Sequence, residues 1–225
     1  MQLLTPVSAY QASLPPPIKK QKKCWDFIIN LFKWIFCCFS FKTDPQHIAA
    51  FFSGGQIPRR RGDCSGMTQI EILSLSNQEL EQRHNFIQWL FPLKKASKSQ
   101  PLAPITTDKA IALCSRQNPD FKARMRANFI LMIRFYGGSF SQKTKQSPIT
   151  LNRIKKIAEM HWLTENNHNY LRITRIITSL KIHGLTNEAT LFHRFIKNIA
   201  TEKNRLAPGT VSDRTLRIWE HAAPK

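Results

Sequence analysis

The chain has 225 residues, enough for one ordinary domain with additional segments. Its 34 lysine and arginine residues exceed its 14 acidic residues, and the formal charge of +20 favours polyanionic partners such as anionic membranes and nucleic acids. The five cysteines show neither a disulfide framework nor the spacing of a zinc site, so we expect reduced thiols and an intracellular location.

The N-terminal part divides into three segments by composition. Residues 1–18 are polar and proline-bearing, which predicts a disordered lead. Residues 19–42 combine lysines with the most apolar run of the chain. Residues 43–75 contain prolines and glycines that interrupt any regular period, which predicts an exposed linker before a helical domain at residues 76–225.

The segment 19–42 is expected to form a hydrophobic amphipathic helix. Asp26, Asn30 and Lys33 recur at helical spacing, so a helix lying in the membrane interface keeps them in water. The residues expected to hold it at an anionic membrane surface are Lys19, Lys20, Lys22, Lys23, Trp25, Phe32, Trp34 and Phe36.

Cys37 and Cys38 are candidates for S-acylation, which adds the second signal that stable membrane attachment requires. Three alternatives stay open for the apolar residues 24–41. They could span a bilayer, since an 18-residue helix reaches about 27 Å. They could also pack in the domain core or act as an uncleaved signal-like segment.

The helical domain begins with a capping box, because Ser76 is followed three residues later by Glu79. The helix is expected to continue to Pro92 and to bury Trp89. A central core helix is predicted from Asn118 to the glycines at 137 and 138. Shorter helices are predicted around 154–161, at 191–199 and at 211–221, and no strand pattern competes with this all-α architecture.

The clearest amphipathic pattern runs from Tyr170 to His183 and ends at Gly184. Its isoleucines and leucine share one face, and Arg172 and Arg175 are expected to point away from the core.

Two blocks resemble the conserved domain of the opioid growth factor receptor family. The first is Glu81-Gln82-Arg83-His84-Asn85-Phe86-Ile87-Gln88-Trp89-Leu90-Phe91-Pro92, and the second is Asn169-Tyr170-Leu171-Arg172-Ile173-Thr174-Arg175-Ile176-Ile177-Thr178-Ser179-Leu180. With weaker echoes elsewhere, the resemblance covers about residues 78–221. It implies a helical receptor domain, opioid peptide recognition, and signalling in the nucleus or at the nuclear envelope. A shared fold does not fix a ligand, so we expect a protein or peptide partner of unspecified identity.

The sequence lacks the phosphate-binding loop, the dinucleotide fingerprint, the nucleophile elbow and the metal-binding helix of common enzyme classes. Its histidines are not spaced for joint metal ligation on a helix, and Cys114 has no local catalytic signature. We therefore expect a non-enzymatic protein without a cofactor or a metal.

The predicted function is a receptor-like or adaptor binding protein, attached to a membrane through its N-terminal helix. The alternative is a basic nucleic-acid-binding protein, with phosphate contacts from Arg153, Lys155, Lys156, Arg172 and Arg175. In a third interpretation, the basic domain face reinforces the membrane anchor. The expected partner-binding residues are the polar members of the two blocks, namely His84, Asn85, Gln88, Asn169, Arg172 and Arg175. The competing interpretation gives them structural roles, with Arg172 paired to an acidic neighbour such as Glu165.

Overall fold

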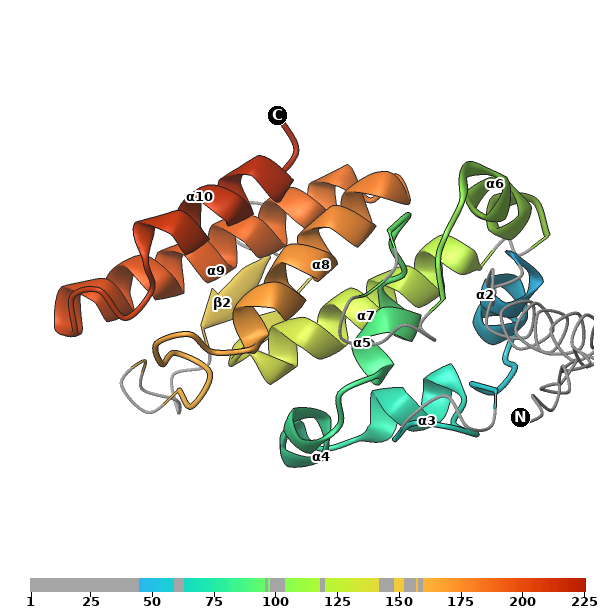
Figure 1. Ribbon diagram of the computed structural model, residues 1–225, viewed down its shortest axis with the longest axis horizontal. Coiled ribbons are helices and arrows are strands. Elements are labelled where there is room, and N and C mark those ends of the chain that lie inside the picture. The colour runs from blue at the N-terminus through green and yellow to red at the C-terminus, as the bar shows by residue number, and fades with distance from the viewer. Residues whose placement is uncertain are drawn as a thin grey trace, which may run out of the picture. The chain divides into compact units, whose positions relative to one another are not determined.

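The computed structural model describes residues 45–58, 63–95, 97, 104–117, 120–141, 148–151, 157 and 160–225. These residues belong to a single unit that covers residues 42–225 and is mostly helical (Figure 1). The predictions for the lead 1–18 and the amphipathic helix 19–42, including Cys37 and Cys38, lie outside the described residues. In the part of the chain that is described, no helix combines the length and the apolar character needed to cross a bilayer.

Helix α7 (Phe121–Phe135) lies in the centre of the unit, as the sequence predicts (Figure 1). Phe121, Met125, Phe129 and Met132 recur at helical spacing and are all buried. The helix ends where Gly137 adopts a positive φ of 89°, a conformation that glycine reaches without steric cost.

Helices α8 (Asn169–Ile182), α9 (Thr186–Leu206) and α10 (Asp213–Ala222) pack against one another in the C-terminal half. The predicted apolar face of α8 is fully buried, and Gly184 follows that helix with a φ of 75°. Trp219 of α10 donates its indole N–H to the Tyr170 carbonyl oxygen at 3.1 Å. This hydrogen bond satisfies the one polar atom of a side chain that is otherwise surrounded by the core.

The single helix predicted from Ser76 to Pro92 is two helices, α4 (Asn77–Gln82) and α5 (Phe86–Leu90). The predicted capping box at Ser76 is present. The break follows because the Asp63 carboxylate accepts the amide N–H groups of His84 at 2.7 Å and Asn85 at 3.3 Å. A distant carboxylate therefore replaces the intrahelical acceptors that would have continued the helix.

The predicted exposed linker at 43–75 is wrong for residues 45–58 and 63–75. Helices α2 (Pro45–Phe52) and α3 (Gln69–Ser74) lie there, and both contribute to the core. The Phe51 ring lies 5.5 Å from Trp89 and the Phe52 ring 4.7 Å from Phe121. Helix α6 (Asp108–Gln117), which the sequence did not predict, packs beside α2 (Figure 1). Frequent glycines and prolines break the periodicity of this region without exposing its aromatic residues.

A small antiparallel sheet corrects the strictly all-α expectation. Strand β1 (Gly138–Phe140) pairs with β2 (Ile149–Leu151), with Ser139 opposite Thr150. Three-residue strands are too short to show a period in the sequence. The predicted helix around 154–161 is not seen at His161, which lies in a turn, and most of its other residues lie outside the described ranges.

Candidate functional site

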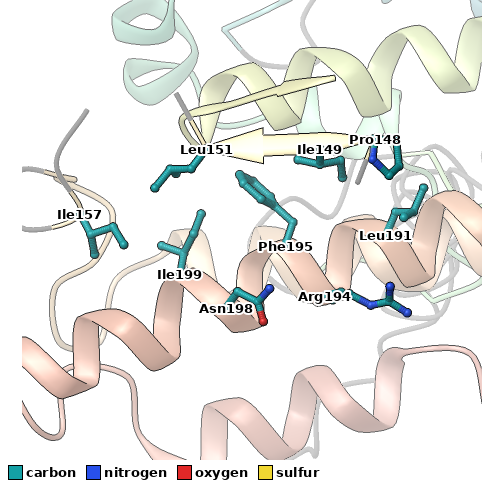
Figure 2. Close-up of a pocket in the computed structure, with 9 residues that line it drawn as sticks. All are labelled: Pro148, Ile149, Leu151, Ile157, Leu191, Arg194, Phe195, Asn198 and Ile199. Carbon is teal, nitrogen blue, oxygen red and sulfur yellow. The ribbon is translucent and has the colours of Figure 1, made fainter. Parts of the chain in front are cut away.

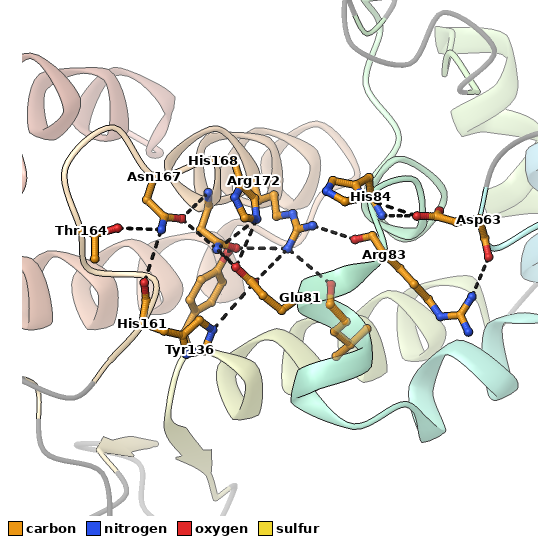
Figure 3. A network of polar contacts seen from close by, with 12 residues as sticks. Asp63, Glu81, Arg83, His84, Tyr136, His161, Thr164, Asn167, His168 and Arg172 are labelled. Carbon is orange, nitrogen blue, oxygen red and sulfur yellow. Dashed lines mark hydrogen bonds and ion pairs between the residues drawn. The ribbon is translucent and has the colours of Figure 1, made fainter.

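The two family-like blocks meet in space, although they are far apart in the sequence. Arg172 of α8 donates to the Arg83 carbonyl oxygen at 2.7 Å and to the Leu80 carbonyl oxygen at 3.5 Å (Figure 3). Its guanidinium also lies 3.4 Å from a Glu81 carboxylate oxygen and over the Phe86 ring at 5.4 Å. The side chain is 6% exposed. Arg172 therefore joins α8 to the break between α4 and α5.

Glu81 is the acidic centre of this network (Figure 3). The Asn169 amide donates to both of its carboxylate oxygens, at 3.1 and 3.2 Å. Two imidazoles lie beside it, with His168 Nε2 at 3.3 Å and His161 Nε2 at 3.8 Å. Burial, followed by the positive charge of Arg172, lowers the pKa of His168. His168 is therefore neutral at pH 7, and Arg172 supplies the buried positive charge opposite Glu81.

Asp63 holds the other end of the network. Its carboxylate accepts the two amides at the α4–α5 break and lies 3.6 Å from His84 Nδ1. Its carbonyl oxygen accepts from Arg83 at 2.6 Å (Figure 3). Asn85, which is buried, accepts the Cys64 amide at 2.9 Å through its side-chain oxygen. These contacts fix the backbone that presents His84 beside α8.

Arg175 lies one turn beyond Arg172 but has a different environment. It donates to the Phe91 carbonyl oxygen at 3.0 Å. Among the described residues, no carboxylate lies within ion-pair distance of Arg175. Burial lowers the pKa of Arg175 to about 10, so the side chain keeps its charge at neutral pH while losing much of its hydration.

A groove of about 630 Å³ lies between α5 and α8, and we call it the α5–α8 groove. Its apolar lining consists of Ile87, Leu93 and Leu171. Its polar lining consists of His84, Gln88, Ser97, His168, Arg172, Arg175 and the two threonines Thr174 and Thr178. Leu171 is 77% exposed on the rim of the groove. Apolar surface beside a few oriented polar groups is typical of ligand sites.

A second groove of about 250 Å³ lies between β2 and α9 (Figure 2). Its apolar lining includes Ile149, Leu151, Ile157, Leu191, Phe195 and Ile199. Arg194 and Asn198 of α9 also line it, and both are exposed to solvent. This groove contains no desolvated charge comparable to Arg175, and neither family-like block contributes to it.

Comparison with known proteins assigns the family. The model of the opioid growth factor receptor (OGFr) conserved region matches residues 61–219. The chain belongs to this family. It is 33% identical over 132 residues to the human opioid growth factor receptor, covering 58% of this chain and 18% of the human protein. The mouse opioid growth factor receptor is 30% identical over 116 residues, which cover 52% of this chain and 18% of that protein.

A further relative is the rat opioid growth factor receptor-like protein 1, which is 29% identical over 129 residues, covering 57% of this chain and 27% of that protein. The chain thus spans about a fifth to a quarter of the length of these relatives. No solved structure matches the chain. These proteins carry the names of receptors and not of enzymes.

Four of the six predicted binding residues of this opioid growth factor receptor family member line the groove, namely His84, Gln88, Arg172 and Arg175. Asn85 and Asn169 do not, because both are buried in structural hydrogen bonds. The prediction that Arg172 points away from the core is wrong, since it is buried. The expected acidic partner also differs, because Arg172 lies beside Glu81 and not beside Glu165.

Sequence reasoning missed Ile87, Leu93, His168, Leu171 and the threonines as groove residues. Leu171, Thr174 and Thr178 follow the helical period of α8, so their common face was a usable signal. Leu93 and His168 lie outside regular helical patterns and gave no comparable signal.

The cysteines of the described region show no nucleophilic character. Cys64 and Cys114 are free and buried. Burial, reinforced at Cys64 by the Asp63 charge, raises the pKa of each thiol to about 11. Both thiols are protonated at neutral pH, and a protonated thiol is a poor nucleophile.

Proposed function

We propose that this chain is a non-enzymatic, receptor-like or adaptor protein that binds a protein or peptide partner in the α5–α8 groove. The observation that carries the proposal is that both family-like blocks build this groove. His84 and Gln88 come from the first block, and Leu171, Arg172 and Arg175 come from the second. The names of the relatives, opioid growth factor receptor and opioid growth factor receptor-like protein 1, support a receptor-like role.

Hydrogen bonds within the groove walls support the binding proposal because they fix groove residues in place before a partner binds. Gln88, with its amide nitrogen turned toward the helix backbone, donates to the carbonyl oxygens of Asn85 at 2.9 Å and His84 at 3.1 Å. Arg172 is fixed by carbonyl oxygens on the opposite wall. A preformed site loses less conformational entropy when a partner binds. The polar residues therefore hold the groove open, while Leu171 and Arg175 are available to a partner.

Nucleic-acid binding, the alternative, loses support from this arrangement. It relied on Arg172 and Arg175 as phosphate contacts. Arg172 is buried, donates to the Arg83 carbonyl oxygen and lies beside Glu81, which leaves only Arg175 of these two to reach a partner. Phosphate contacts require guanidinium groups that reach the backbone of a duplex or a single strand. The other basic residues of that hypothesis, at positions 153, 155 and 156, lie outside the described residues.

Photocrosslinking in cells tests the binding proposal. A benzophenone amino acid is placed at position 171, on the groove rim, or at position 206, where Leu206 is also exposed at the end of α9. We expect a discrete adduct from position 171 alone, digested by protease and resistant to nuclease. Equal adducts from both positions would contradict a groove-specific partner. A nuclease-sensitive adduct at 171 would favour the nucleic-acid alternative.

The proposal includes attachment to an anionic membrane through residues 19–42, which precede the helical domain. The basis is the sequence of that segment, with Lys19, Lys20, Lys22 and Lys23 beside an apolar run and with Cys37 and Cys38 as acylation candidates. The resemblance adds the nucleus or the nuclear envelope as the expected compartment.

Fractionation of the full chain and of a variant lacking residues 19–42 tests the attachment. We expect the full chain alone to pellet with membranes, to resist carbonate, and to be released by hydroxylamine if thioesters contribute. The third interpretation, in which the basic domain reinforces the anchor, predicts that the deletion variant still binds vesicles containing phosphatidylserine at low salt. Membrane attachment fails if both chains remain soluble and neither binds the vesicles.

A further inference from the structure

The α5–α8 groove has an uncompensated positive charge. Among the described residues that line it, none is acidic, whereas Arg172 and Arg175 are both cationic at neutral pH. Arg172 is balanced by Glu81 at 3.4 Å. Arg175 has no such partner within the described region, and its hydrogen bond to Phe91 satisfies only one guanidinium N–H group. The electrostatic character of the groove therefore depends on Arg175.

Keeping such a charge in a partly buried position costs free energy unless an anion meets it. Arg175 is held on the groove wall, with Ile87 and Leu171 among the neighbouring lining residues. A carboxylate that reaches this guanidinium forms charge-assisted hydrogen bonds, which are shorter and stronger than those between neutral groups. The surrounding apolar surface excludes water and strengthens that attraction.

The source of the carboxylate is indicated by what surrounds Arg175. Capture of a chain terminus commonly uses several convergent backbone N–H groups. The amide N–H groups of Thr174, Arg175 and Thr178 lie in the interior of α8 and are used in the helix itself, so this wall of the groove offers side chains instead. This arrangement favours a side-chain carboxylate, from a peptide segment that runs along α8 and carries both acidic and apolar residues.

We infer that the partner contributes an acidic side chain flanked by apolar residues, and that Arg175 is the residue that selects this carboxylate. The inference rests on the proposed function, because it names the class of partner that the groove accepts. The apolar flanks contact Leu171 and Leu93, while the aspartate or glutamate of the partner reaches Arg175. The net charge of the chain, +20, adds electrostatic attraction to acidic partners.

Three short peptides probe this selection on the full chain with labelled isoleucine and leucine methyl groups. Acetyl-Leu-Glu-Leu-amide carries a side-chain carboxylate, and acetyl-Leu-Gln-Leu-amide is its neutral counterpart. Acetyl-Leu-Gln-Leu with a free C-terminus carries a terminal carboxylate only. Binding is followed by NMR through the methyl shifts of Ile87, Leu93 and Leu171. We expect the glutamate peptide to bind at least tenfold more tightly than the neutral peptide, a difference of about 1.4 kcal/mol.

The variants separate selection from folding. Arg175→Gln is expected to remove the tenfold preference while the neutral peptide binds as before, and Arg175→Lys is expected to restore part of it. Arg194→Gln, at the β2–α9 groove, is the matched control because it removes one exposed arginine from another groove, and it is expected to keep the preference. Leu171→Glu is expected to abolish binding of all three peptides, with a spectrum that otherwise remains native.

Each contrary result has a distinct meaning. If the glutamate and glutamine peptides bind equally, or the preference survives in Arg175→Gln, the inference is wrong and the groove can still be a binding site. If the terminal carboxylate is preferred over the glutamate, the inferred source of the anion is wrong. If no peptide shifts the groove methyl groups, the proposed function of the groove fails together with the inference.

Discussion

Arg172 and Glu81 face each other at 3.4 Å although 91 residues separate them in the chain. The arginine also donates to the carbonyl oxygens of Arg83 and Leu80. A single side chain of α8 therefore satisfies backbone acceptors at the C-terminal end of α4, where the helix breaks. This contact brings the two family-like blocks into one structural unit. It also explains why a charged residue of an otherwise amphipathic helix is buried.

Removing the guanidinium of Arg172 is expected to destabilise the domain strongly. In Arg172→Met, apolar volume replaces the stem, but Glu81 and two carbonyl oxygens lose a donor. We expect a loss of about 2–4 kcal/mol in the free energy of unfolding, measured by urea denaturation. Arg172→Lys keeps the charge and is expected to lose less. The exposed Arg194→Met is the control and is expected to change stability by less than about 0.5 kcal/mol.

Arg175→Met is expected to leave stability nearly unchanged, although it lies one turn away. The substitution removes one hydrogen bond to the Phe91 carbonyl oxygen and also removes a desolvated charge without an acidic partner. These effects oppose each other, so we expect a change within about 1 kcal/mol of zero. Equal losses in Arg172→Met and Arg175→Met, measured in the same urea titrations, would contradict the distinction drawn between the two arginines.

Gln69 and Asn128 form a buried polar pair between α3 and α7. The Gln69 amide donates to Asn128 Oδ1 at 2.7 Å, and the Asn128 amide donates to the Leu90 carbonyl oxygen at 3.0 Å. Gln69→Leu and Asn128→Leu each leave a buried partner unsatisfied and are each expected to cost about 1–3 kcal/mol. A double-mutant cycle should show the double variant about 1 kcal/mol more stable than the sum of the single losses predicts. Strict additivity would mean that the two amides act independently.

The domain is expected to lose stability on mild acidification through His183. Burial lowers the pKa of His183 below its usual 6.5, and its Nε2 is buried without a hydrogen-bond partner. The unfolded chain binds a proton below pH 6.5, whereas the folded chain resists it until its lower pKa is reached. The contribution of neutral His183 to the free energy of unfolding is therefore fully present above pH 6.5. It is lost as the pH falls from 6.5 through the folded pKa.

The His183→Asn variant tests this assignment, because asparagine can keep the donor to the Ser179 carbonyl oxygen, 2.7 Å from His183 Nδ1, without titrating. Guanidinium denaturation at pH 7.5 and 5.0 should show a smaller loss on acidification in the variant than in the wild type. His221→Asn, at an exposed position of α10, should keep the wild-type loss. An unchanged pH dependence in His183→Asn would assign the effect to other groups.

A methyl group at Gly138 is expected to be poorly tolerated. An added Cβ would lie 2.6 Å from Phe195 Cζ and 2.8 Å from Ile133 Cγ2, closer than packed carbon atoms approach. Gly138→Ala should therefore lower the free energy of unfolding by about 1–3 kcal/mol, seen as a reduced melting temperature. Ser139→Ala, at the next and exposed position of β1, should melt close to the wild type.

The sequence predicts long helices well where one face is apolar at a sustained period. This was true of the central helix through Phe129, of the helix ending at Gly184, and of the capping box at Ser76. Short elements were not predictable in the same way. The three-residue strands and the helices before Ser76 lie among glycines and prolines, and their burial depends on partners far away in the chain.

The candidate site shows the same division. Four of the six expected residues, from the two family-like blocks, line the groove. Their roles could not be inferred, because periodicity places Arg172 and Arg175 on the polar side of α8 without showing what covers that side. The carbonyl oxygens of Arg83 and Phe91 cover it, and both come from a backbone segment whose break depends on Asp63.

The sequence by itself determined the helical class, the family and the two blocks that contain the candidate residues. Helical periodicity and short motifs involve residues that are close together in the chain, so both can be recognised without a structure. The tertiary structure decided that Arg172 faces Glu81 and that Arg175 faces no carboxylate among the described residues. The burial of Arg172 and its contact with Glu81 depend on residues that are 91 positions apart in the chain. Local sequence patterns do not report such long-range contacts.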